Sequence, residues 1–526
     1  MKVLVSDKLA EVGIKMFEKA KGIKVDVKVG LTPKELKAVI KGYEALVIRS
    51  ATKVTKDILK AAGRLKVIGR AGIGLDNVDI PTATKQGIVV MNTPSGNVVT
   101  TAEHTIAMML ALSRNIPQGT ASLKAGRWEK KNLQGKEVFN KILGVIGYGR
   151  IGSIVASRAR GLKMKVIVHD RSANKEMLDQ VGLELVSLKD LYRRSDYITV
   201  HLPKSKETVN LINQEAFDQM KPGVMIINCA RGGIVNEKDL LDALKSGKVG
   251  GAALDVFETE PPGASPLLKF NNVICTPHLG ASTAEAQTNV AVAVAEQIIS
   301  YLQTGTIVNA VNVPSVSGAL LAKLQPYLTL AERMGCLHTQ LAEGSIKEVT
   351  IKYLGDFLGL DMNPVTTAGI KGLLAPFLKD EVNFVNAPVI AKERGIKVVE
   401  SRSVEAEDFT NLITIHATAS KGSNTVSGTI FGKREPRIVR INNFRLEVVP
   451  EGHLLFIHNL DKPGAIGSIG TVLGRNNINI ARMHVGQERD GERNVILLDT
   501  DTPTPPETIE ELRALPLVKS VTPLEL

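Results

Sequence analysis

The chain has 526 residues, 44% hydrophobic and 23% charged, which is ordinary for a folded protein and sufficient for three or four domains. Its formal net charge of +12 permits contact with nucleic acid or membranes, but attraction of small anionic ligands explains it equally well. Three widely spaced cysteines argue against a disulfide framework or a zinc site, and we expect no metal. The N-terminal apolar run is too short for a signal peptide, and no apolar stretch approaches the roughly 18 residues of a membrane span, so we expect a cytoplasmic protein.

The first hundred residues alternate short apolar runs with amphipathic helical patterns, which predicts a parallel sheet in an α/β architecture. Strands are expected at 2–6, 25–29, 44–50 and 66–72, with helices at 7–22 and 32–42. A long apolar helix predicted at 100–119 should lead into a second unit.

The alternation resumes from about residue 141 to 281. Strands are expected at 142–149, 165–170, 197–203, 224–230, 251–257 and 272–278. These runs are apolar on both faces, which is typical of parallel strands covered by helices on both sides.

The last part of the chain has a different character. A helix at 282–305 precedes a linker at 309–318, which contains Pro, Ser and Gly. Residues 320–450 form a separate unit with strand-like runs at 348–355, 412–420, 424–432 and 444–450. From residue 453 onward the order strand, helix, strand, strand, helix, strand predicts a ferredoxin-like βαββαβ unit.

A glycine motif follows the predicted strand at 142–149. Gly147, Gly149 and Gly152 have GxGxxG spacing and open a helical pattern, which is the context of a dinucleotide-binding turn. The phosphates would lie on free amides at the helix N-terminus. Asp170 ends the next strand, 18 residues after Gly152, where its carboxylate would bind ribose hydroxyls and favour NAD. Arg171 beside it leaves NADP open, because an arginine can receive a 2′-phosphate.

Three polar residues lie just after predicted strands, where ligands bind in doubly wound sheets. They are Arg231, Glu260 and His278. Oxidation of a hydroxyl beside a carboxylate needs a base, and histidine suits neutral pH. A carboxylate would orient the ring, and a guanidinium would grip the substrate carboxylate. Singly, each residue also fits a structural role as an ion-pair partner, turn residue or strand cap; jointly they indicate catalysis.

The segments VIGYGRIG, NCARGGIVNEKDLLDAL, GAALDVFETEPP and CTPHLGAST resemble the signature segments of the D-2-hydroxyacid dehydrogenases. The resemblance implies that Arg231 binds and polarises substrate, that Glu260 tunes the histidine and that His278 exchanges the proton. It places Asp255 and the backbone near Cys229 beside the nicotinamide. The expected NAD-binding residues are Gly147, Gly149, Arg150, Ile151, Gly152, Asp170, Cys229, Ala230, Arg231, Asp255, His278 and Gly280.

The resemblance also implies that the chain crosses out of the substrate domain and returns. We therefore expect a flavodoxin-like substrate domain at 1–98 plus 283–312 and a Rossmann-like NAD-binding domain at 99–282, making a cleft between them. Both are expected to be α/β domains with doubly wound parallel sheets. An α+β intervening regulatory domain is expected at 313–450, and a ferredoxin-like ACT domain at 451–526.

In the N-terminal unit, LVIRSATKVT, VIGRAGIGLDNVDI and MNTPSGN resemble the branch of this family that oxidises 3-phospho-D-glycerate to 3-phosphohydroxypyruvate, the first step of L-serine biosynthesis. Arg49 and Arg70 end predicted strands, and a buried phosphate needs such cations. Pairing of these arginines with local acids is the alternative. By resemblance, Gly72 and Asn97 also contact substrate.

The segment AGRWEKKNL holds the only tryptophan, Trp128. In the family this segment reaches a neighbouring subunit near its active site. The resemblance therefore implies a homodimer core, expected to build a homotetramer, with Trp128 at the interface and Lys130 near the partner's substrate. The alternative is a solvated basic end of a helix.

The segment HLLFIHNLDKPGAIGSIGTVLGRNNINIARM resembles an ACT domain, a ligand-sensing module of amino-acid metabolism. Asn459, Asp461 and Asn479 match positions that contact the effector L-serine in related dehydrogenases. An aspartate can pair with the ammonium group of serine, and an asparagine can both donate and accept. The alternative is an ACT fold that only joins subunits.

Residues 320–450 resemble, more weakly, the intervening domain of the long form of these dehydrogenases. Basic residues gather near its end, at Lys433, Arg434, Arg437, Arg440 and Arg445. We expect them to form a solvated strand edge protected from aggregation, rather than a site for an anionic effector.

Two functions other than the oxidation of 3-phospho-D-glycerate are also compatible with the sequence. The first is the same chemistry on another acid, such as hydroxypyruvate, glyoxylate or 2-hydroxyglutarate. The second is a non-enzymatic, dinucleotide-sensing platform like the corepressors of this superfamily. A pure sensor would not need the Arg–Glu–His set, and no recognition helix or aromatic-basic pattern indicates nucleic acid.

Overall fold

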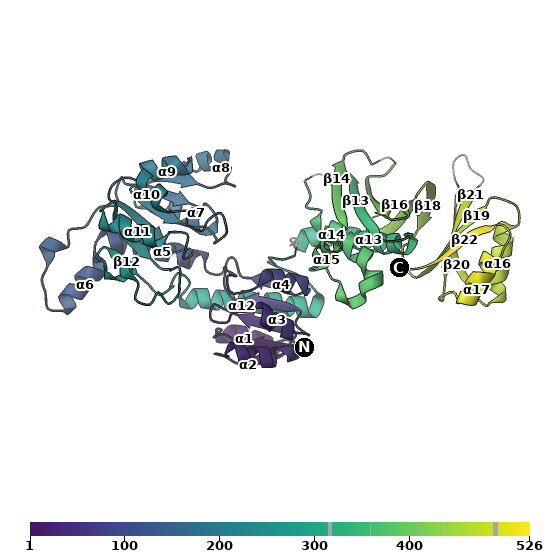
Figure 1. Cartoon of the computed structure of the whole chain (residues 1–526), viewed down its shortest axis with the longest axis horizontal. Coiled ribbons are helices and arrows are strands. Elements are labelled where there is room, and N and C mark those ends of the chain that lie inside the picture. Colours follow the sequence, from purple (N-terminus) through teal and green to yellow (C-terminus); the bar gives the residue numbers. More distant parts are fainter. Residues whose placement is uncertain (314–317, 358, 407, 433, 488–492) are drawn as a thin grey trace.

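The structure is a computed structural model that describes residues 1–313, 318–357, 359–406, 408–432, 434–487 and 493–526. Within these residues the strands form four sheets, which follow one another along the chain (Figure 1). The first two sheets are parallel, the third is mixed and the fourth is antiparallel, as the expected fold class requires. Over the described ranges, no helix combines the length and apolar character needed to cross a membrane.

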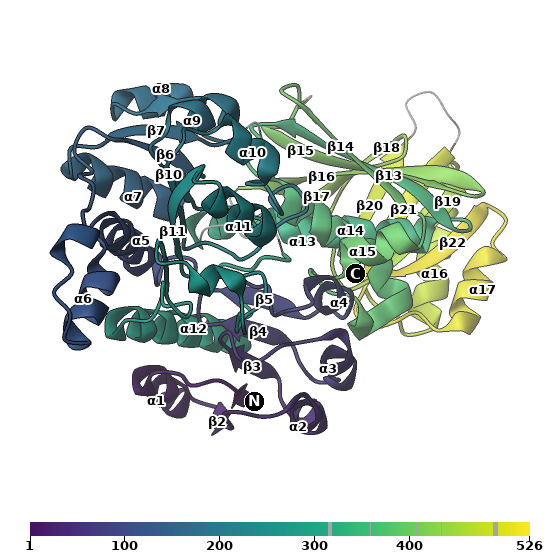
Figure 2. The ribbon, with the colours of Figure 1, turned by 60° about the vertical axis from the view of Figure 1, so that its left-hand side comes forward.

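The first sheet has strand order β2-β1-β3-β4-β5, the doubly wound order of flavodoxin-like folds. Its core takes in α12, which comes from far along the sequence: Val290, Val294 and Ile298 are buried in the same cluster as Val3 and Val47 (Figures 1 and 2). The elements are β1 (Lys2–Val5), α1 (Glu11–Lys19), β2 (Lys24–Val27), α2 (Pro33–Val39), η1 (Ile40–Gly42), β3 (Ala45–Ile48), α3 (Lys56–Ala61), β4 (Val67–Arg70), α4 (Ile80–Lys85), β5 (Val89–Asn92) and α12 (Ala284–Thr304).

The second sheet has strand order β12-β11-β10-β9-β6-β7-β8, with every pair parallel. This is the Rossmann order extended by one strand. The elements are α5 (Val98–Ser113), α6 (Ile116–Lys124), η2 (Lys130–Asn132), β6 (Ile142–Ile146), α7 (Arg150–Gly161), β7 (Lys165–His169), α8 (Lys175–Gln180), β8 (Glu184–Leu185), α9 (Leu188–Arg194), β9 (Tyr197–Val200), α10 (Gln214–Gln219), β10 (Val224–Asn228), α11 (Glu237–Lys245), β11 (Val249–Leu254), η3 (Pro266–Lys269) and β12 (Val273–Cys275).

The single helix predicted at 100–119 is wrong. The chain instead forms α5 and α6, separated at Asn115, which has left-handed backbone angles with φ = 52°. Pro117 then lies at the start of α6. A proline lacks the N–H that a continuous helix would donate to the carbonyl of Ser113, so it is tolerated in the first turn of a new helix, and α6 starts at Ile116.

The third sheet has strand order β14-β13-β15-β16-β17-β18, and α13 and α14 pack together beside it. Among the described residues of this sheet, only the β13–β14 pair is parallel. The elements are α13 (Gly318–Leu341), β13 (Ile346–Gly355), α14 (Asn363–Leu378), η4 (Lys379–Glu381), α15 (Ala387–Glu393), β14 (Lys397–Ser403), β15 (Asn411–Ala419), β16 (Gly422–Phe431), β17 (Glu435–Ile441) and β18 (Phe444–Val448).

The prediction that the basic residues at 433–445 form one solvated edge is wrong for β17. This strand pairs with β16 on one side and β18 on the other. Arg437 on β17 has only 18% of its side chain exposed, pairs with Glu435 and Glu447 and lies over the ring of Phe431. Arg445, on the terminal strand β18, is mostly exposed. Lys433 lies outside the described residues.

The fourth sheet has strand order β20-β21-β19-β22, the arrangement of a ferredoxin-like βαββαβ unit. One face is covered by α16 and α17. The opposite face contributes Leu454, Phe456, Val495 and Leu497 to the same core as α13 and the third sheet, so the last two units share one core. The elements are β19 (His453–Leu460), α16 (Ala465–Arg475), β20 (Ile480–Gln487), β21 (Arg493–Thr500), α17 (Pro506–Arg513) and β22 (Val518–Glu525).

The segment predicted as a linker begins as part of the first sheet. The amide of Val311 donates to the carbonyl of Val90, and Asn312 bonds through its side chain to Ile88 and Val90. These bonds hold residues 309–312 along β5. The side-chain carboxamide of Asn312 accepts from the backbone N–H of Val90 and donates to the carbonyl of Ile88, two groups that no described strand pairs on this side. Residues 314–317 of the predicted linker lie outside the described residues.

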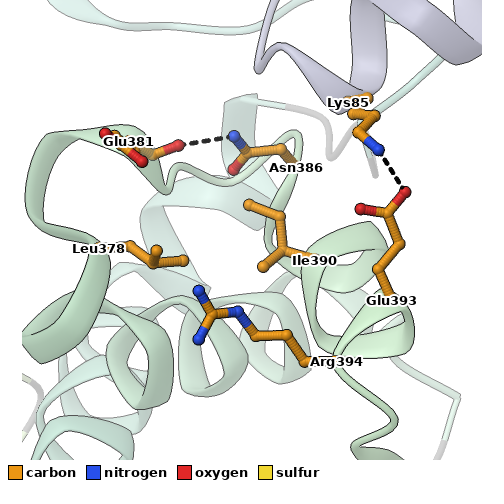
Figure 3. A pocket seen from close by; sticks show the side chains of 7 residues that line it. All are labelled: Lys85, Leu378, Glu381, Asn386, Ile390, Glu393 and Arg394. Atoms are coloured by element: carbon orange, nitrogen blue, oxygen red, sulfur yellow. Dashed lines mark hydrogen bonds and ion pairs between the residues drawn. The ribbon is translucent and has the colours of Figure 1, made fainter.

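The third unit also docks directly on the first. Val385 is 4% exposed and belongs to the core of the first sheet, whereas its neighbour Phe384 packs against the core of the third sheet. The side chain of Asn383 donates to the carbonyl of Gly87, which precedes β5. Beside this contact lies a cavity of about 330 Å³, bordered by the Lys85–Glu393 ion pair of 2.7 Å (Figure 3).

Candidate active site

The glycine turn between β6 and α7 has the geometry that a dinucleotide requires. Gly147 has φ = 93°, a conformation that a side chain would strain. A Cβ on Gly152 would lie 2.0 Å from the carbonyl oxygen of Gly147, so only glycine lets α7 approach the turn. A Cβ on Gly149 would meet no atom within 4 Å, which leaves its backbone open to a ligand. Arg150 and Ile151 follow as the first residues of α7.

Asp170 lies just beyond β7 and faces this turn. Its carboxylate accepts hydrogen bonds from the amide of Tyr148 at 2.7 Å and from the amide and hydroxyl of Ser172. Burial alone would raise the pKa of Asp170, but these hydrogen bonds outweigh burial and lower it. The residue is therefore an ionised acceptor beside the turn, which fits the ribose hydroxyls of NAD.

His278 and Glu260 lie beyond β12 and β11, which are neighbouring parallel strands. The Nδ1 atom of His278 lies 2.8 Å from Oε2 of Glu260. About two-fifths of each side chain is exposed, so the pair borders solvent. Because Nδ1 faces the carboxylate, Nε2 is the nitrogen left to exchange a proton with a substrate.

Asp255 holds the His278 segment in place. Its carboxylate accepts from the amides of Leu279 and Gly280 at 2.6 and 2.9 Å, and its carbonyl accepts from the amide of His278. His104 and Thr276 also bond to the carboxylate. Burial would raise the pKa of Asp255, but these partners lower it, so the buried group stays ionised. Neither His104 nor Thr276 was among the predicted site residues.

The segment after β10 carries Cys229, Ala230 and Arg231. Cys229 and Ala230 are buried, and burial raises the pKa of the Cys229 thiol to about 12, so it is no nucleophile at neutral pH. Arg231 is partly buried. Its Nε donates to Asp76 of the first unit at 2.8 Å, and its Nη1 donates to the carbonyl of Ala230.

The predicted substrate residues of the first unit lie beyond its strands. Arg70 ends β4, and its buried Nε has no acceptor among the described residues. Burial, together with nearby Arg231 and Arg49, lowers the pKa of Arg70 to about 10. Gly72 gives Arg70 room, since a Cβ there would lie 2.3 Å from Nη1 of Arg70.

Two further polar atoms near this point are buried without a partner in the described structure. They are Oδ1 of Asn97 and Oγ1 of Thr93. Buried polar atoms are normally paired, so these atoms and the Nε of Arg70 fit a site completed by a polar ligand. Arg49, in contrast, bonds locally through Nη1 to the carbonyl of Lys8.

The remaining predicted residues do not lie near His278, Arg231 and Arg70 within one chain. Lys130 and Trp128 lie on the arm that begins with α6 and projects from the second unit (Figure 1), and Trp128 is 81% exposed. The effector candidates belong to the fourth unit, at the opposite end of the molecule. Asn459 is buried, with Oδ1 unpartnered in the described structure; Asn479 donates to Asp501; and Asp461 precedes α16.

Three family models match successive parts of the chain. The NAD-binding domain of D-isomer specific 2-hydroxyacid dehydrogenases matches residues 106–280, which include the turn at Gly147 and the ends of β10 to β12. The class of protein is therefore that of the NAD-dependent D-2-hydroxyacid dehydrogenases. The D-3-phosphoglycerate dehydrogenase intervening domain matches residues 323–442, and the ACT domain matches residues 453–517.

Relatives that match along nearly the whole chain show which family within this class the chain belongs to. A D-3-phosphoglycerate dehydrogenase of Synechocystis sp. is 46% identical and covers 97% of this chain and 92% of its own. One of Archaeoglobus fulgidus is 44% identical over the full length of both chains. The solved D-lactate dehydrogenase of Aquifex aeolicus, complexed with NAD and lactic acid, covers 60% of this chain and all of its own, with 29% identity and a TM-score of 0.54. The chain belongs to the D-3-phosphoglycerate dehydrogenase family.

Proposed function

We propose that the chain oxidises 3-phospho-D-glycerate to 3-phosphohydroxypyruvate with NAD, the first step of L-serine synthesis. The observation that carries the proposal is the 2.8 Å pair of His278 and Glu260, at the sheet edge that also presents Arg231 and the Gly147 turn. The full-length relatives named for this activity support the choice of substrate.

In this reaction His278 accepts the proton of the substrate hydroxyl at Nε2. Glu260 stabilises the imidazolium that forms, because its carboxylate already lies at Nδ1. Arg231 binds the substrate carboxylate through its remaining N–H groups and stabilises charge on the reacting oxygen. NAD, when bound, would supply the hydride acceptor: the carbon that bears the substrate hydroxyl would lose its C–H bond, the hydroxyl its O–H bond, and the C–O bond would become C=O.

The proposed NAD contacts are the turn, the ionised Asp170, the segment Cys229 to Arg231, Asp255, and the segment His278 to Gly280. The proposed substrate contacts are Arg49, Arg70, Gly72 and Asn97. The unpartnered Nε–H of Arg70 supports an anionic ligand group such as the phosphate, whereas the unpartnered Oδ1 of Asn97 is an acceptor and suits the substrate hydroxyl. The local bond of Arg49 to Lys8 would have to yield for this residue to take part.

We further propose a homodimer core, built into a tetramer, with the arm at the interface. The exposed indole of Trp128 supports this, because a large exposed aromatic side chain is typical of an interface. Lys130 would then approach the substrate of the partner. L-serine is the proposed effector at Asn459, Asp461 and Asn479, and the proposed location is the cytoplasm.

The test measures NADH formation with 3-phosphoglycerate and 2-hydroxyglutarate, and NADH consumption with hydroxypyruvate and glyoxylate. We expect a preference for the phosphorylated acid, and a loss of about 100- to 10,000-fold in kcat for His278→Gln. His453→Gln, on β19 of the ACT unit, is the matched control. Equal rates in wild type and His278→Gln would remove His278 from the mechanism.

A further inference from the structure

Arg231 is held by residues of the opposite domain. Its Nε donates to Oδ2 of Asp76 at 2.8 Å, although Asp76 belongs to the loop between β4 and α4 of the first unit. Its Nη1 donates to the carbonyl of its own neighbour Ala230. A guanidinium has five N–H donors in a fixed plane, so these two bonds fix the plane and leave the second Nη1 hydrogen and both Nη2 hydrogens for a ligand.

The loop that carries Asp76 is itself firmly attached. The side-chain amide of Asn77 donates to the carbonyls of Arg49 and Thr52 at 2.7 and 2.6 Å. Asp79 caps α4 by accepting from the amide of Thr82. Both anchors follow Asp76 closely in the chain and hold the backbone beside it, so its carboxylate is a fixed acceptor for the arginine.

Gly74 supplies the space in which the guanidinium lies. A Cβ built on Gly74 would be 1.7 Å from Nη2 of Arg231 and 2.8 Å from Oδ2 of Asp76. No left-handed backbone angle is present at Gly74, so the need for glycine there comes from the arginine rather than from the turn.

We propose that Asp76 is a positioning residue for Arg231 and that the missing side chain of Gly74 leaves room for the guanidinium. Together they would direct the free N–H groups of Arg231 toward the substrate carboxylate. This inference rests on the proposed function, because it assumes that Arg231 binds the substrate. Asp76 also places negative charge near both cations: it pairs with Arg231, and it raises the pKa of Arg70, which Arg231 lowers.

The first test compares Asp76→Asn with Asp57→Asn, which removes an equal charge from an exposed site on α3 of the same unit. We expect Asp76→Asn to lower kcat/KM for 3-phosphoglycerate about 10- to 100-fold, with a raised KM for the acid and an unchanged KM for NAD. Asp57→Asn should match wild type. A lowered KM for the acid in Asp76→Asn would mean that the carboxylate competes with substrate, and it would overturn the proposal.

A double-mutant cycle separates the proposal from its premise. Arg231→Lys keeps the charge but lacks the Nε–H that Asp76 engages, so adding Asp76→Asn to it should change kcat/KM less than twofold. A further tenfold loss would show that Asp76 acts elsewhere and would refute positioning. If Arg231→Lys impairs the enzyme while Asp76→Asn does not, only the positioning role fails. Wild-type kinetics in Arg231→Lys and Arg231→Ala would remove the role of Arg231 itself.

The gap is tested by Gly74→Ala against Gly63→Ala, in the turn before β4, where a Cβ would meet nothing within 4 Å. We expect Gly74→Ala to reproduce the raised KM for the acid while NAD binding and the thermal midpoint stay near those of Gly63→Ala. Unchanged kinetics in a folded Gly74→Ala protein would contradict the proposal.

Discussion

His278 is held in a backbone conformation that few side chains adopt. Its φ is 55°, in the left-handed region, which costs a non-glycine residue about 1–2 kcal/mol. The carbonyl and carboxylate of Asp255 offset this cost by accepting from three successive amides, those of His278, Leu279 and Gly280. These hydrogen bonds fix the backbone from which the His278 side chain extends toward Glu260.

A second histidine makes a testable contribution to stability. His338 on α13 is fully buried, and its Nε2 lies 3.0 Å from the carbonyl oxygen of Ile415. Burial lowers the pKa of His338 to about 4, against about 6.5 when unfolded. The folded pKa is depressed, so between pH 6.5 and 4 the unfolded chain binds a proton that the folded chain does not, and stability falls as the pH falls.

We expect His338 to account for about 3 kcal/mol of lost unfolding free energy by pH 4. His338→Gln keeps a donor for Ile415 but does not titrate, so its unfolding free energy should fall less steeply over this range. Urea unfolding at pH 7, 6, 5 and 4 measures the difference, with His453→Gln as control. Parallel curves for wild type and His338→Gln would contradict the assignment.

The sequence could predict that Arg231, Glu260 and His278 lie at one edge of the sheet, because each follows an apolar strand and parallel strands present their carboxyl ends at one edge. It could not identify Asp76 or His104. Asp76 meets Arg231 only when two domains come together, and nothing in its neighbourhood in sequence marks that contact. His104 lies inside an apolar helix, where a buried structural histidine and a site residue look alike.

At the scale of elements, α13 and α14 pack through glycines. A Cβ on Gly335 would lie 2.1 Å from the carbonyl oxygen of Gly369, and one on Gly372 would lie 1.9 Å from that of Glu332. The two helices therefore approach at backbone distance beside the third sheet. The sequence could not predict α14, because this helix is apolar nearly all round and shows no amphipathic period.

Gly335→Ala should destabilise the intervening unit by about 1–3 kcal/mol, because the helices cannot separate without disturbing the core that they cover. Gly470→Ala, inside α16, meets open space and should stabilise its helix by up to about 1 kcal/mol. Urea unfolding of both variants measures this opposite pair of effects. A free energy of unfolding equal to that of wild type in Gly335→Ala would mean that α13 and α14 can move apart at little energetic cost.

At the scale of the molecule, the four units form a bent row, with the paired catalytic units at one end and the ACT unit at the other (Figure 1). The sequence predicted the units from their separate patterns. It could not predict how the third docks on the first, because that contact consists of Asn383 and Val385 in an irregular segment with no periodicity.

Val385→Asp should undock the third unit, because it places a carboxylate in an apolar core. We expect a larger radius of gyration by small-angle X-ray scattering and faster proteolysis between residues 305 and 313. Val404→Asp, at a side chain that is 68% exposed, is the matched control and should leave both unchanged. An unchanged radius in Val385→Asp would show that other contacts suffice for docking.

The adjacent residues Phe384 and Val385 have a consequence for chimeric enzymes. Phe384 packs against the core of the third sheet and Val385 belongs to the core of the first sheet, although only one peptide bond separates them. An exchange of halves between relatives at the junction near residue 313 therefore transfers Val385 into a foreign catalytic core. Functional chimeras should require that the core residues packed with Val385, and Gly87, whose carbonyl accepts from Asn383, come from the same parent as residues 383–385.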